Sequence, residues 1–489
     1  MKDLKERTIR GGLVVISGQT AMFVLRTASL VVLARLLTPK DFGLVGMVAA
    51  VTGVLEIFKD AGLSLITVQR ATITEEQTST LFWINVLVGM MLFGVSLAIA
   101  PLLVAFYNES RLFWVTTAMG CGFVFSGAAA QHGALLNRQM RFATLTTINV
   151  VASSISIALA IILAASGYGY WSLVGMNITL PATGCVLVWL AAQWIPGRPR
   201  RKVGARSMLR FGGTVTLNSL IVYFVNNADK VLLGRFCGAE ALGIYGRAYQ
   251  LINVPTQNLN GAIGSVALPA LSRLQDDPDR SKNYFLKGYS IVLAMTLPVT
   301  IACALFADEL ILVLLGPKWK DAVTVFRLLT PAVLAFALLN PFAWHVLSTG
   351  KVGRLLKMAL VIAPIVIAGY AFGLRYGPGG VALGYSAALT LLIVPVIAWA
   401  KNGTAISWWD ILQTVSRPFL SAIVAAAAAF AVQILFGRSL SPFLRLALGV
   451  IVLSGAYLWM LLYVMGQKAT YLDLFRGLRR RESYKRRDD

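Results

Sequence analysis

Cations inside apolar segments are the residues of this sequence with the most chemistry to offer. Arg26, Lys59, Lys230 and Arg247 lie within, or at the edge of, stretches that are otherwise apolar. A charge inside a bilayer is costly, so such a side chain usually faces water or the interior of a helix bundle. Arg26 has no acidic residue on its own helical face, which favours an anionic ligand. We therefore predict that these four cations bind an anion.

Uncharged polar residues accompany two of these cations at helical spacing. Tyr223 and Asn226 lie seven and four residues before Lys230, so the three share one helical face. Gln19 and Arg26 are also seven residues apart and share a face. Further polar residues crowd one side of a later helix, beyond Lys230. The predicted site therefore includes six uncharged residues, which are Gln19, Tyr223, Asn226, Tyr249, Asn253 and Gln257.

Three acidic residues in the same segments could bind a coupling cation. They are Asp229, Glu56 and Asp60. Glu56, Lys59 and Asp60 lie at positions i, i+3 and i+4 of a helix, so they equally favour a structural ion pair that neutralises itself. Asp229 and Lys230 are sequence neighbours that point in different directions, which does not favour a simple pair. Both interpretations of Glu56 and Asp60 remain open at this point.

These residues belong to a chain that consists mostly of apolar segments. Its 489 residues are 57% hydrophobic and 13% charged, whereas soluble domains contain about 25% charged residues. About fourteen stretches are long enough to cross ~30 Å of hydrocarbon, and backbone groups in lipid must pair within a helix. The sequence predicts an all-α polytopic membrane protein with about 14 transmembrane helices. The stretches are about 12–37, 43–67, 80–104, 112–136, 143–166, 170–195, 209–234, 243–271, 286–307, 323–347, 355–374, 379–400, 418–437 and 442–466.

The net charge of +23 does not indicate a nucleic-acid-binding protein, because the basic residues are sorted by side. If the N-terminus lies inside, roughly 30 of the 44 lysines and arginines fall in cytosolic segments and about 9 in outer ones. Both termini are then predicted to be cytosolic. The richest runs, 198–210 and 479–487, are predicted to orient the chain and to contact anionic lipid head groups.

A repeat with an offset of about two hundred residues divides the chain. It predicts two six-helix pseudo-symmetric lobes, 1–196 and 209–400, joined by a basic cytosolic linker, 197–208. Two additional transmembrane helices, 401–466, and a basic tail, 467–489, have no counterpart. Two copies of one bundle with a site between them are a common transporter architecture. Arg10, Gly12, Leu33, Arg35, Gly43 and Gly46 recur in order as Arg210, Gly212, Leu233, Arg235, Gly243 and Gly246.

Several other residues have simpler interpretations. Asp41 precedes a helix and is predicted to cap it rather than to bind a cation. Arg35 and Arg235 occupy matching outer helix ends and are predicted to extend toward the membrane interface. His132 and His345 favour packing or capping over a proton relay. The four cysteines are far apart, so their spacing predicts neither a metal site nor a disulfide framework.

Patterns typical of enzymes and nucleotide-binding proteins do not occur in a fitting context. Residues 377–382 match the loose dinucleotide-binding pattern, but they follow a predicted membrane span and not a strand. Gly350-Lys351 is followed by Val352, so it is not a P-loop. No nucleophile lies next to a base. The sequence therefore predicts a protein that is not an enzyme and that holds no cofactor or metal. The energy for transport is expected from a proton or sodium gradient, from the membrane potential or from downstream consumption of the product.

Five segments resemble one family of exporters. They are Leu37–Gly43, Lys59–Leu63, Ala134–Phe142, Ala228–Arg235 and Leu242–Tyr249. They resemble the polysaccharide-transport branch of the multidrug/oligosaccharidyl-lipid/polysaccharide (MOP) exporter superfamily. The resemblance covers about residues 5–400 and is strongest to Wzx-type flippases of the colanic-acid and exopolysaccharide kind.

This resemblance implies a multi-pass protein of the bacterial inner membrane whose two lobes alternate in access. Members of the family flip undecaprenyl-diphosphate-linked oligosaccharide to the periplasmic leaflet for exopolysaccharide and lipopolysaccharide biosynthesis. Polysaccharide polymerase and export machinery are the partners that it implies. Basic cavity residues hold the diphosphate in relatives, and Arg26, Lys59, Lys230 and Arg247 occupy such positions here. The last two helices, 418–437 and 442–466, are expected to shape a groove for the lipid tail.

Two other functions remain open. A cation-coupled multidrug-type exporter of the same superfamily would favour an acidic cavity, whereas the charged residues found here are balanced or lean basic. A membrane enzyme, such as a polysaccharide polymerase or ligase, would need a sizeable outer loop that carries Arg or His. The longest outer segment, about 307–322, contains no His.

Overall fold

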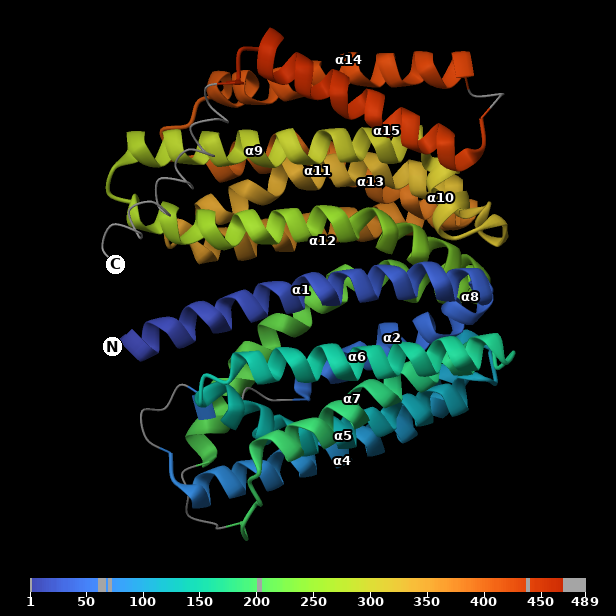
Figure 1. Ribbon diagram of the computed structural model, residues 1–489, viewed down its shortest axis with the longest axis vertical. Coiled ribbons are helices and arrows are strands. Elements are labelled where there is room, and N and C mark those ends of the chain that lie inside the picture. The colour runs from blue at the N-terminus through green and yellow to red at the C-terminus, as the bar shows by residue number, and fades with distance from the viewer. Residues whose placement is uncertain (1, 60–66, 69–72, 200–204, 437–439, 469–489) are drawn as a thin grey trace. The chain divides into compact units, whose positions relative to one another are not determined.

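The protein is almost entirely helical. The structure, a computed structural model, describes residues 2–59, 67–68, 73–199, 205–436 and 440–468 (Figure 1). Fourteen α-helices lie in these residues, and none of the described residues forms a β-strand. Eleven stretches of the described residues are long and apolar enough to span a membrane. The predicted class, an all-α polytopic membrane protein, is confirmed.

The first seven described helices contain eight of the predicted spans. The two spans predicted at 209–234 and 243–271 are two helices that share the label α8 and meet at Gly238, whose backbone angles (φ 84°, ψ 178°) are not helical. The helices are α1 (Lys2–Leu36), α2 (Pro39–Phe58), α4 (Glu75–Tyr107), α5 (Leu112–Arg138), α6 (Phe142–Ala165), α7 (Tyr170–Ala192) and α8 (Ala205–Arg273).

The remaining helices contain the other six predicted spans and one helix that the sequence did not predict. This extra helix is α10, which occupies part of the predicted outer loop 307–322 and buries Ala307, Glu309 and Ile311. The helices are α9 (Pro278–Leu305), α10 (Ala307–Leu314), α11 (Ala322–Ser348), α12 (Val352–Gly373), α13 (Gly377–Lys401), α14 (Trp408–Phe436) and α15 (Pro442–Trp459).

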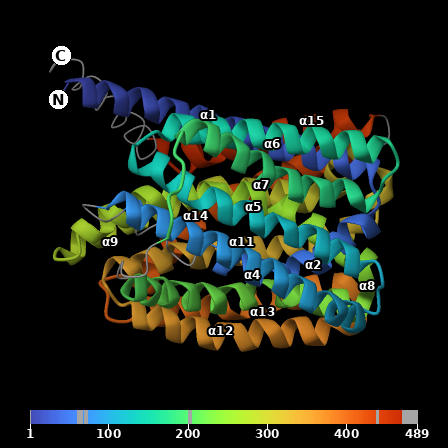
Figure 2. The same ribbon diagram turned by 90° about the horizontal axis from the view of Figure 1, so that it is seen from below.

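The chain forms two compact units, Met1–Gly246 and Arg247–Asp489, with the boundary inside α8. In the first unit α1 packs against α6, while α5 packs against both α4 and α7, as the views from two sides show (Figures 1 and 2). In the second unit α11 packs against α9 and α13, and α14 packs against α9 and α15. The repeat-based division into 1–196 and 209–400 stays a prediction.

The backbone repeats a helix turn in both units. Helix α5 ends at Arg138, and Met140 then adopts a left-handed conformation (φ 56°). Helix α11 ends at Ser348, and Gly350, two residues later as Met140 is after Arg138, also has a positive φ (71°). Each of these two residues donates its backbone N–H to the carbonyl oxygen three residues earlier, at 2.9 and 3.0 Å. The two hairpins therefore share one turn geometry although their sequences differ.

Repeat-equivalent glycines meet within the first unit. A Cβ atom at Gly43 would lie 1.6 Å from the carbonyl oxygen of Ala239, and one at Gly243 would lie 1.8 Å from that of Pro39. Each blocking carbonyl belongs to the residue four positions before the opposite glycine, so the contact is reciprocal. Helix α2 and the first part of α8 thus touch backbone to backbone, which accounts for the place of this part of α8 in the first unit.

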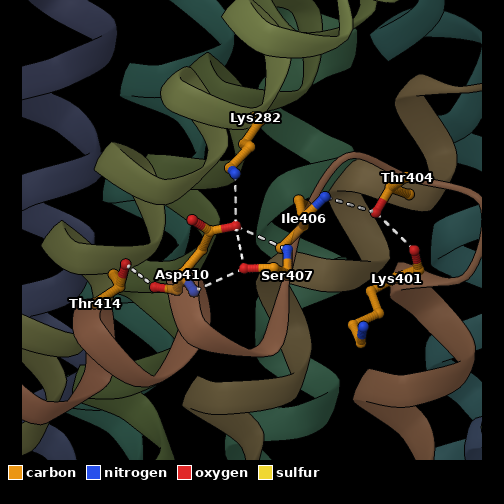
Figure 3. A network of polar contacts seen from close by, with 7 residues as sticks. All are labelled: Lys282, Lys401, Thr404, Ile406, Ser407, Asp410 and Thr414. Carbon is orange, nitrogen blue, oxygen red and sulfur yellow. Dashed lines mark hydrogen bonds and ion pairs between the residues drawn. The ribbon is translucent and has the colours of Figure 1, made fainter.

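The two additional helices, α14 and α15, attach to the second unit near both of their ends. Lys282 of α9 forms an ion pair with Asp410 of α14 at 2.6 Å (Figure 3). The buried carboxylate of Glu309 in α10 accepts hydrogen bonds from Arg445 of α15 at 3.2 Å and from Gln433 of α14 at 3.3 Å. These polar contacts fix the α14–α15 hairpin against α9 and α10.

Replacing Gly43 with alanine should destabilise the protein, because the new methyl group would displace the α8 backbone. Overpacking of this kind costs roughly 1–3 kcal/mol, so the midpoint of thermal denaturation in detergent should fall. The matched control is Gly133→Ala in α5, where a Cβ meets no atom within 4 Å and alanine favours the helix. Equal midpoints for the two variants would contradict the close backbone contact.

Candidate functional site

The predicted polar stripe of α1 lies on the exposed face of that helix. Gly18 faces α6, because a Cβ there would lie 2.0 Å from Cγ2 of Thr146. Gln19 and Arg26 are both exposed. None of the described carboxylates lies within ion-pair distance of Arg26. Arg26 is therefore an exposed cation within an apolar helix, and its predicted contact with an anionic ligand stays a prediction.

Tyr223 joins the first part of α8 to α2. Its hydroxyl lies 3.1 Å from the carbonyl oxygen of Ala49 and 3.0 Å from that of Ala50, and it donates to this pair. The side chain occupies the space beside Gly53, where a Cβ would lie 2.0 Å from the hydroxyl oxygen. In this structure the Tyr223 hydroxyl is thus engaged by backbone carbonyls of α2.

Lys230 is held by an amide and not by a carboxylate. Its Nζ donates to Oδ1 of Asn227 at 2.7 Å, and Nδ2 of Asn227 donates to the carbonyl oxygen of Tyr223 at 2.9 Å. The ammonium group forms no ion pair with the carboxylates that the structure describes. Asn227 was missed by the sequence reasoning, although its position three residues before Lys230 could have indicated the contact. The side chain of Asn226 lies outside the described part.

Asp229 is a buried carboxylate that forms no ion pair with the neighbouring Lys230. It is 2% exposed, and its Oδ1 accepts the backbone N–H of Lys230 at 2.8 Å. The buried side chain of Tyr245 lies next to it, beyond the bend at Gly238. Tyr245 was also missed, because the bend that brings residues 229 and 245 together has no local helical periodicity.

The predicted pairing of Glu56 with Lys59 occurs. The Nζ of Lys59 lies 2.9 Å from Oε2 of Glu56, and the two side chains are 38% and 53% exposed. Exposed ion pairs of this type contribute about 0–1 kcal/mol to stability. Lys59 is thus at least partly neutralised by its neighbour, whereas Asp60 lies outside the described residues.

The predicted residues at the start of the second unit mainly contact neighbours within α8, and one of them also approaches α13. Asn253 donates through Nδ2 to the carbonyl oxygen of Tyr249 at 3.0 Å, and Nη1 of Arg247 donates to Oε1 of Gln250. The Tyr249 ring lies 6.3 Å from that of Tyr385 in α13, measured between centroids. Nothing in the local sequence indicated that Tyr385 would join this group. The side chain of Gln257 is outside the described part.

Three residues with simpler interpretations, Asp41, His132 and His345, cap or pack as predicted, whereas the predicted extension of Arg235 toward the membrane interface stays a prediction. Asp41 caps α2 together with Thr38, because the side chain of each accepts the backbone N–H of the other. His132 is buried and stacks on Trp189 with 4.2 Å between centroids. His345 is also buried and packs near Phe285. Arg235 lies over the ring of Phe106, 5.5 Å from its centroid.

The arrangement suits an anionic ligand. Arg26 and Lys230 both belong to the first unit, and both lack a carboxylate partner among the described residues. Hydrogen bonds from arginine and lysine to phosphate oxygens are charge-assisted and roughly twice as strong as neutral ones. Each of these two cations could therefore hold an anionic oxygen.

Comparison with known families shows to which family the chain belongs. The model of the family described as "Polysaccharide biosynthesis protein" matches residues 32–324. The chain belongs to this polysaccharide biosynthesis family. This assignment confirms the resemblance found in the sequence. The predicted site residues from Glu56 to Gln257 lie inside the matched region, whereas Gln19 and Arg26 precede it.

Relatives in this family are named for polysaccharide biosynthesis and transport. The teichuronic acid biosynthesis protein TuaB of Bacillus subtilis is 27% identical, over 60% of this chain and 62% of TuaB. The lipopolysaccharide biosynthesis protein WzxC of Escherichia coli is 24% identical, over 78% of each chain. The succinoglycan biosynthesis transport protein ExoT of Rhizobium meliloti is 23% identical, over 83% of this chain and 80% of ExoT. The matched region thus spans less than two thirds of TuaB.

Solved structures of MOP-type transporters share the fold of this family member. The lipid II flippase MurJ matches 96% of this chain and all of its own with a TM-score of 0.74, at 13% identity. A multidrug resistance MATE transporter of the MOP superfamily matches 80% of this chain and 97% of its own with a TM-score of 0.61, at 14% identity. Family and fold together point to a multi-pass membrane transporter.

Replacing Tyr223 with phenylalanine should loosen the contact between α8 and α2. A hydrogen bond of this kind contributes about 0.5–1.5 kcal/mol, so the midpoint of thermal denaturation in detergent should fall modestly. Tyr168→Phe, at an exposed turn between α6 and α7, is the matched control and should leave the midpoint unchanged. An unchanged midpoint for Tyr223→Phe would show that the hydroxyl does not join the two helices.

Proposed function

We propose that this protein flips undecaprenyl-diphosphate-linked oligosaccharide repeat units across the bacterial inner membrane by alternating access. Its family, its relatives and its fold support the coarser statement, that it is a lipid-linked polysaccharide transporter. The observation that supports the finer proposal is that Arg26 and Lys230 have no carboxylate partner among the described residues. Both are cations of apolar helices, and neither is paired with a described carboxylate.

The diphosphate explains why such cations would be kept. Moving a doubly or triply charged group through a low-dielectric region is prohibitive unless opposite charges accompany it. Arg26 and Lys230 would supply these charges in the first unit, with Lys59 and Arg247 as further contributors. Gln19, Asn226, Tyr249, Asn253 and Gln257 would contact sugar hydroxyls. Tyr223 would join them only in a conformation that frees its hydroxyl from α2.

Energy for directed transport would come from an ion gradient or from the membrane potential. In this proposal the protein is a transporter and not an enzyme, and it needs no bound cofactor. Asp229 is the most suitable residue to couple a proton or sodium ion, because it is a buried carboxylate in a membrane helix. Glu56 is paired with Lys59, which makes it less suitable, and Asp60 remains a further candidate.

The cellular setting follows from the same proposal. Both termini would lie in the cytosol, because the basic segments gather on that side. Anionic membrane lipids would surround these segments. A polysaccharide polymerase and export machinery would receive the flipped units on the periplasmic side.

A cation-coupled multidrug-type exporter of the same superfamily is the second candidate function. The likeness to the MATE transporter and the buried carboxylate of Asp229 favour it. A cationic drug, however, would meet Arg26 and Lys230, which repel it. Drug sensitivity of a deletion strain that still makes normal polysaccharide would favour this second function.

Charge reversal tests the proposed function directly. Arg26→Glu and Lys230→Glu should each abolish polysaccharide export at unchanged protein level, because each turns an attraction for diphosphate into a repulsion. Lys230→Arg should keep most of the activity. Mass analysis should reveal lipid-linked oligosaccharide accumulating in a deletion strain and in both reversal strains.

The control for these variants is Lys287→Glu. This lysine is an exposed residue of α9 and lies outside the predicted site, so its reversal should leave export intact. Normal export by Arg26→Glu or Lys230→Glu would show that the replaced residue does not hold the diphosphate. A deletion strain without accumulated lipid-linked sugar would contradict the proposed substrate itself.

A further inference from the structure

A basic corner forms in the second unit where three helices meet one linker. We call it the linker corner and define it by Lys351, Arg354, Lys401 and Trp408. Arg354 donates through Nη1 to the carbonyl oxygen of Asn402 at 2.6 Å. The Nζ of Lys351 lies 3.8 Å from the position that a Cβ would take at Gly403. The turn before α12 thus brings two cations to the linker that follows α13.

The linker itself is a defined turn. Gly403 adopts a left-handed conformation (φ 74°), which lets the backbone N–H of Thr404 return to the carbonyl oxygen of Lys401 at 3.0 Å. The hydroxyl of Thr404 accepts the backbone N–H of Ile406 at 3.3 Å (Figure 3). These hydrogen bonds fix the backbone of the linker, and with it the position of the Lys401 Cα atom.

Tryptophans place this corner at the level of a membrane interface. The Nζ of Lys401 lies 5.0 Å from the ring centroid of Trp408. Trp408 and Trp409 are 44% and 64% exposed, and tryptophan is enriched where head groups meet hydrocarbon. Further along α14, Leu412 and Phe419 are also exposed. The basic residues of α12, α13 and the turn before α12 therefore adjoin an exposed apolar face of α14.

The lysines of the corner have no acidic partner among the described residues, because none of the described carboxylates lies within ion-pair distance of Lys351 or Lys401. Asp410 follows Trp408 by two residues, and its Oδ2 already receives Lys282 at 2.6 Å and the backbone N–H and hydroxyl of Ser407 at 2.8 and 2.7 Å. Figure 3 draws no contact between Lys401 and this carboxylate.

The geometry points to a binding site for the phosphate of an anionic phospholipid head group at the linker corner. Lys351 and Lys401 bind the phosphate, Arg354 adds positive potential while it caps α13, and Trp408 and Trp409 lie beside the glycerol region. A soluble phosphate would make no use of the exposed apolar face of α14, whereas a phospholipid covers it. The site is independent of the proposed transport function.

Native mass spectrometry of the full chain in detergent tests this site with phosphatidylglycerol as the probe. The variant is Lys351→Gln with Lys401→Gln. Each lysine near an anionic lipid contributes about a factor of five to binding, so the double variant should bind phosphatidylglycerol about 25-fold more weakly. Phosphatidylcholine, which has no net charge, should bind weakly to the parent protein and to the variant alike.

The matched control removes two lysines elsewhere in the same unit. Lys318→Gln with Lys320→Gln makes the same change of charge in the segment after α10, where both residues are exposed, and should bind phosphatidylglycerol as the parent does. Thermal denaturation verifies that both double variants are folded. Unchanged binding by the linker-corner variant, or equal weakening by the control, would overturn the proposal.

A second probe separates membrane lipid from transport substrate. Undecaprenyl diphosphate should bind to the linker-corner variant as tightly as to the parent protein, because Arg26 and Lys230 are intact. If this diphosphate lost affinity while phosphatidylglycerol kept it, the corner would be a substrate site and the lipid assignment would be wrong. Failure of the proposed flippase function would leave the result for phosphatidylglycerol unchanged.

Discussion

The high cost of an unpaired charge inside a bilayer constrains every other feature of this molecule. Charges near helix ends form ion pairs, as Arg111 does with Glu109 at 2.8 Å and Arg327 with Asp308 at 2.6 Å. Arg26 and Lys230 lie in apolar helices and form none with the described carboxylates. Such positions are kept only where water or a ligand offsets the cost, and in the proposed function a diphosphate would supply the opposite charge. The related cost of an unpaired backbone group in lipid explains why the described backbone is helical almost throughout.

The duplication arranges the helices that carry these residues. Gly43 and Gly243, which are equivalent in the repeat, let α2 and α8 touch backbone to backbone. Tyr223 adds hydroxyl contacts to α2 further along the same pair of helices. The first part of α8 therefore belongs to one compact unit with α2, and Lys230 lies in this part of α8. The second part of α8 carries Arg247 into the other unit.

Most of the fold was predictable from the sequence, because the lengths of the apolar stretches and the breaks between them can be read directly from the order of the residues. The break between residues 234 and 243 was among these, whereas the short helix α10 was not, because it depends on packing partners elsewhere in the chain. In the site, the Glu56–Lys59 contact follows from helical spacing. The contacts of Tyr245 with Asp229 and of Tyr385 with Tyr249 were beyond prediction, because no local periodicity connects these residues.

The central claim is that cations in the membrane helices carry a diphosphate. Its most direct test is a flipping assay with the purified protein in liposomes, comparing an oligosaccharide on undecaprenyl diphosphate with the same oligosaccharide on an uncharged polyprenyl lipid. The account predicts that the protein accelerates movement of the diphosphate-linked form between leaflets and leaves the uncharged form at the rate of empty liposomes. Equal acceleration of both forms would contradict it.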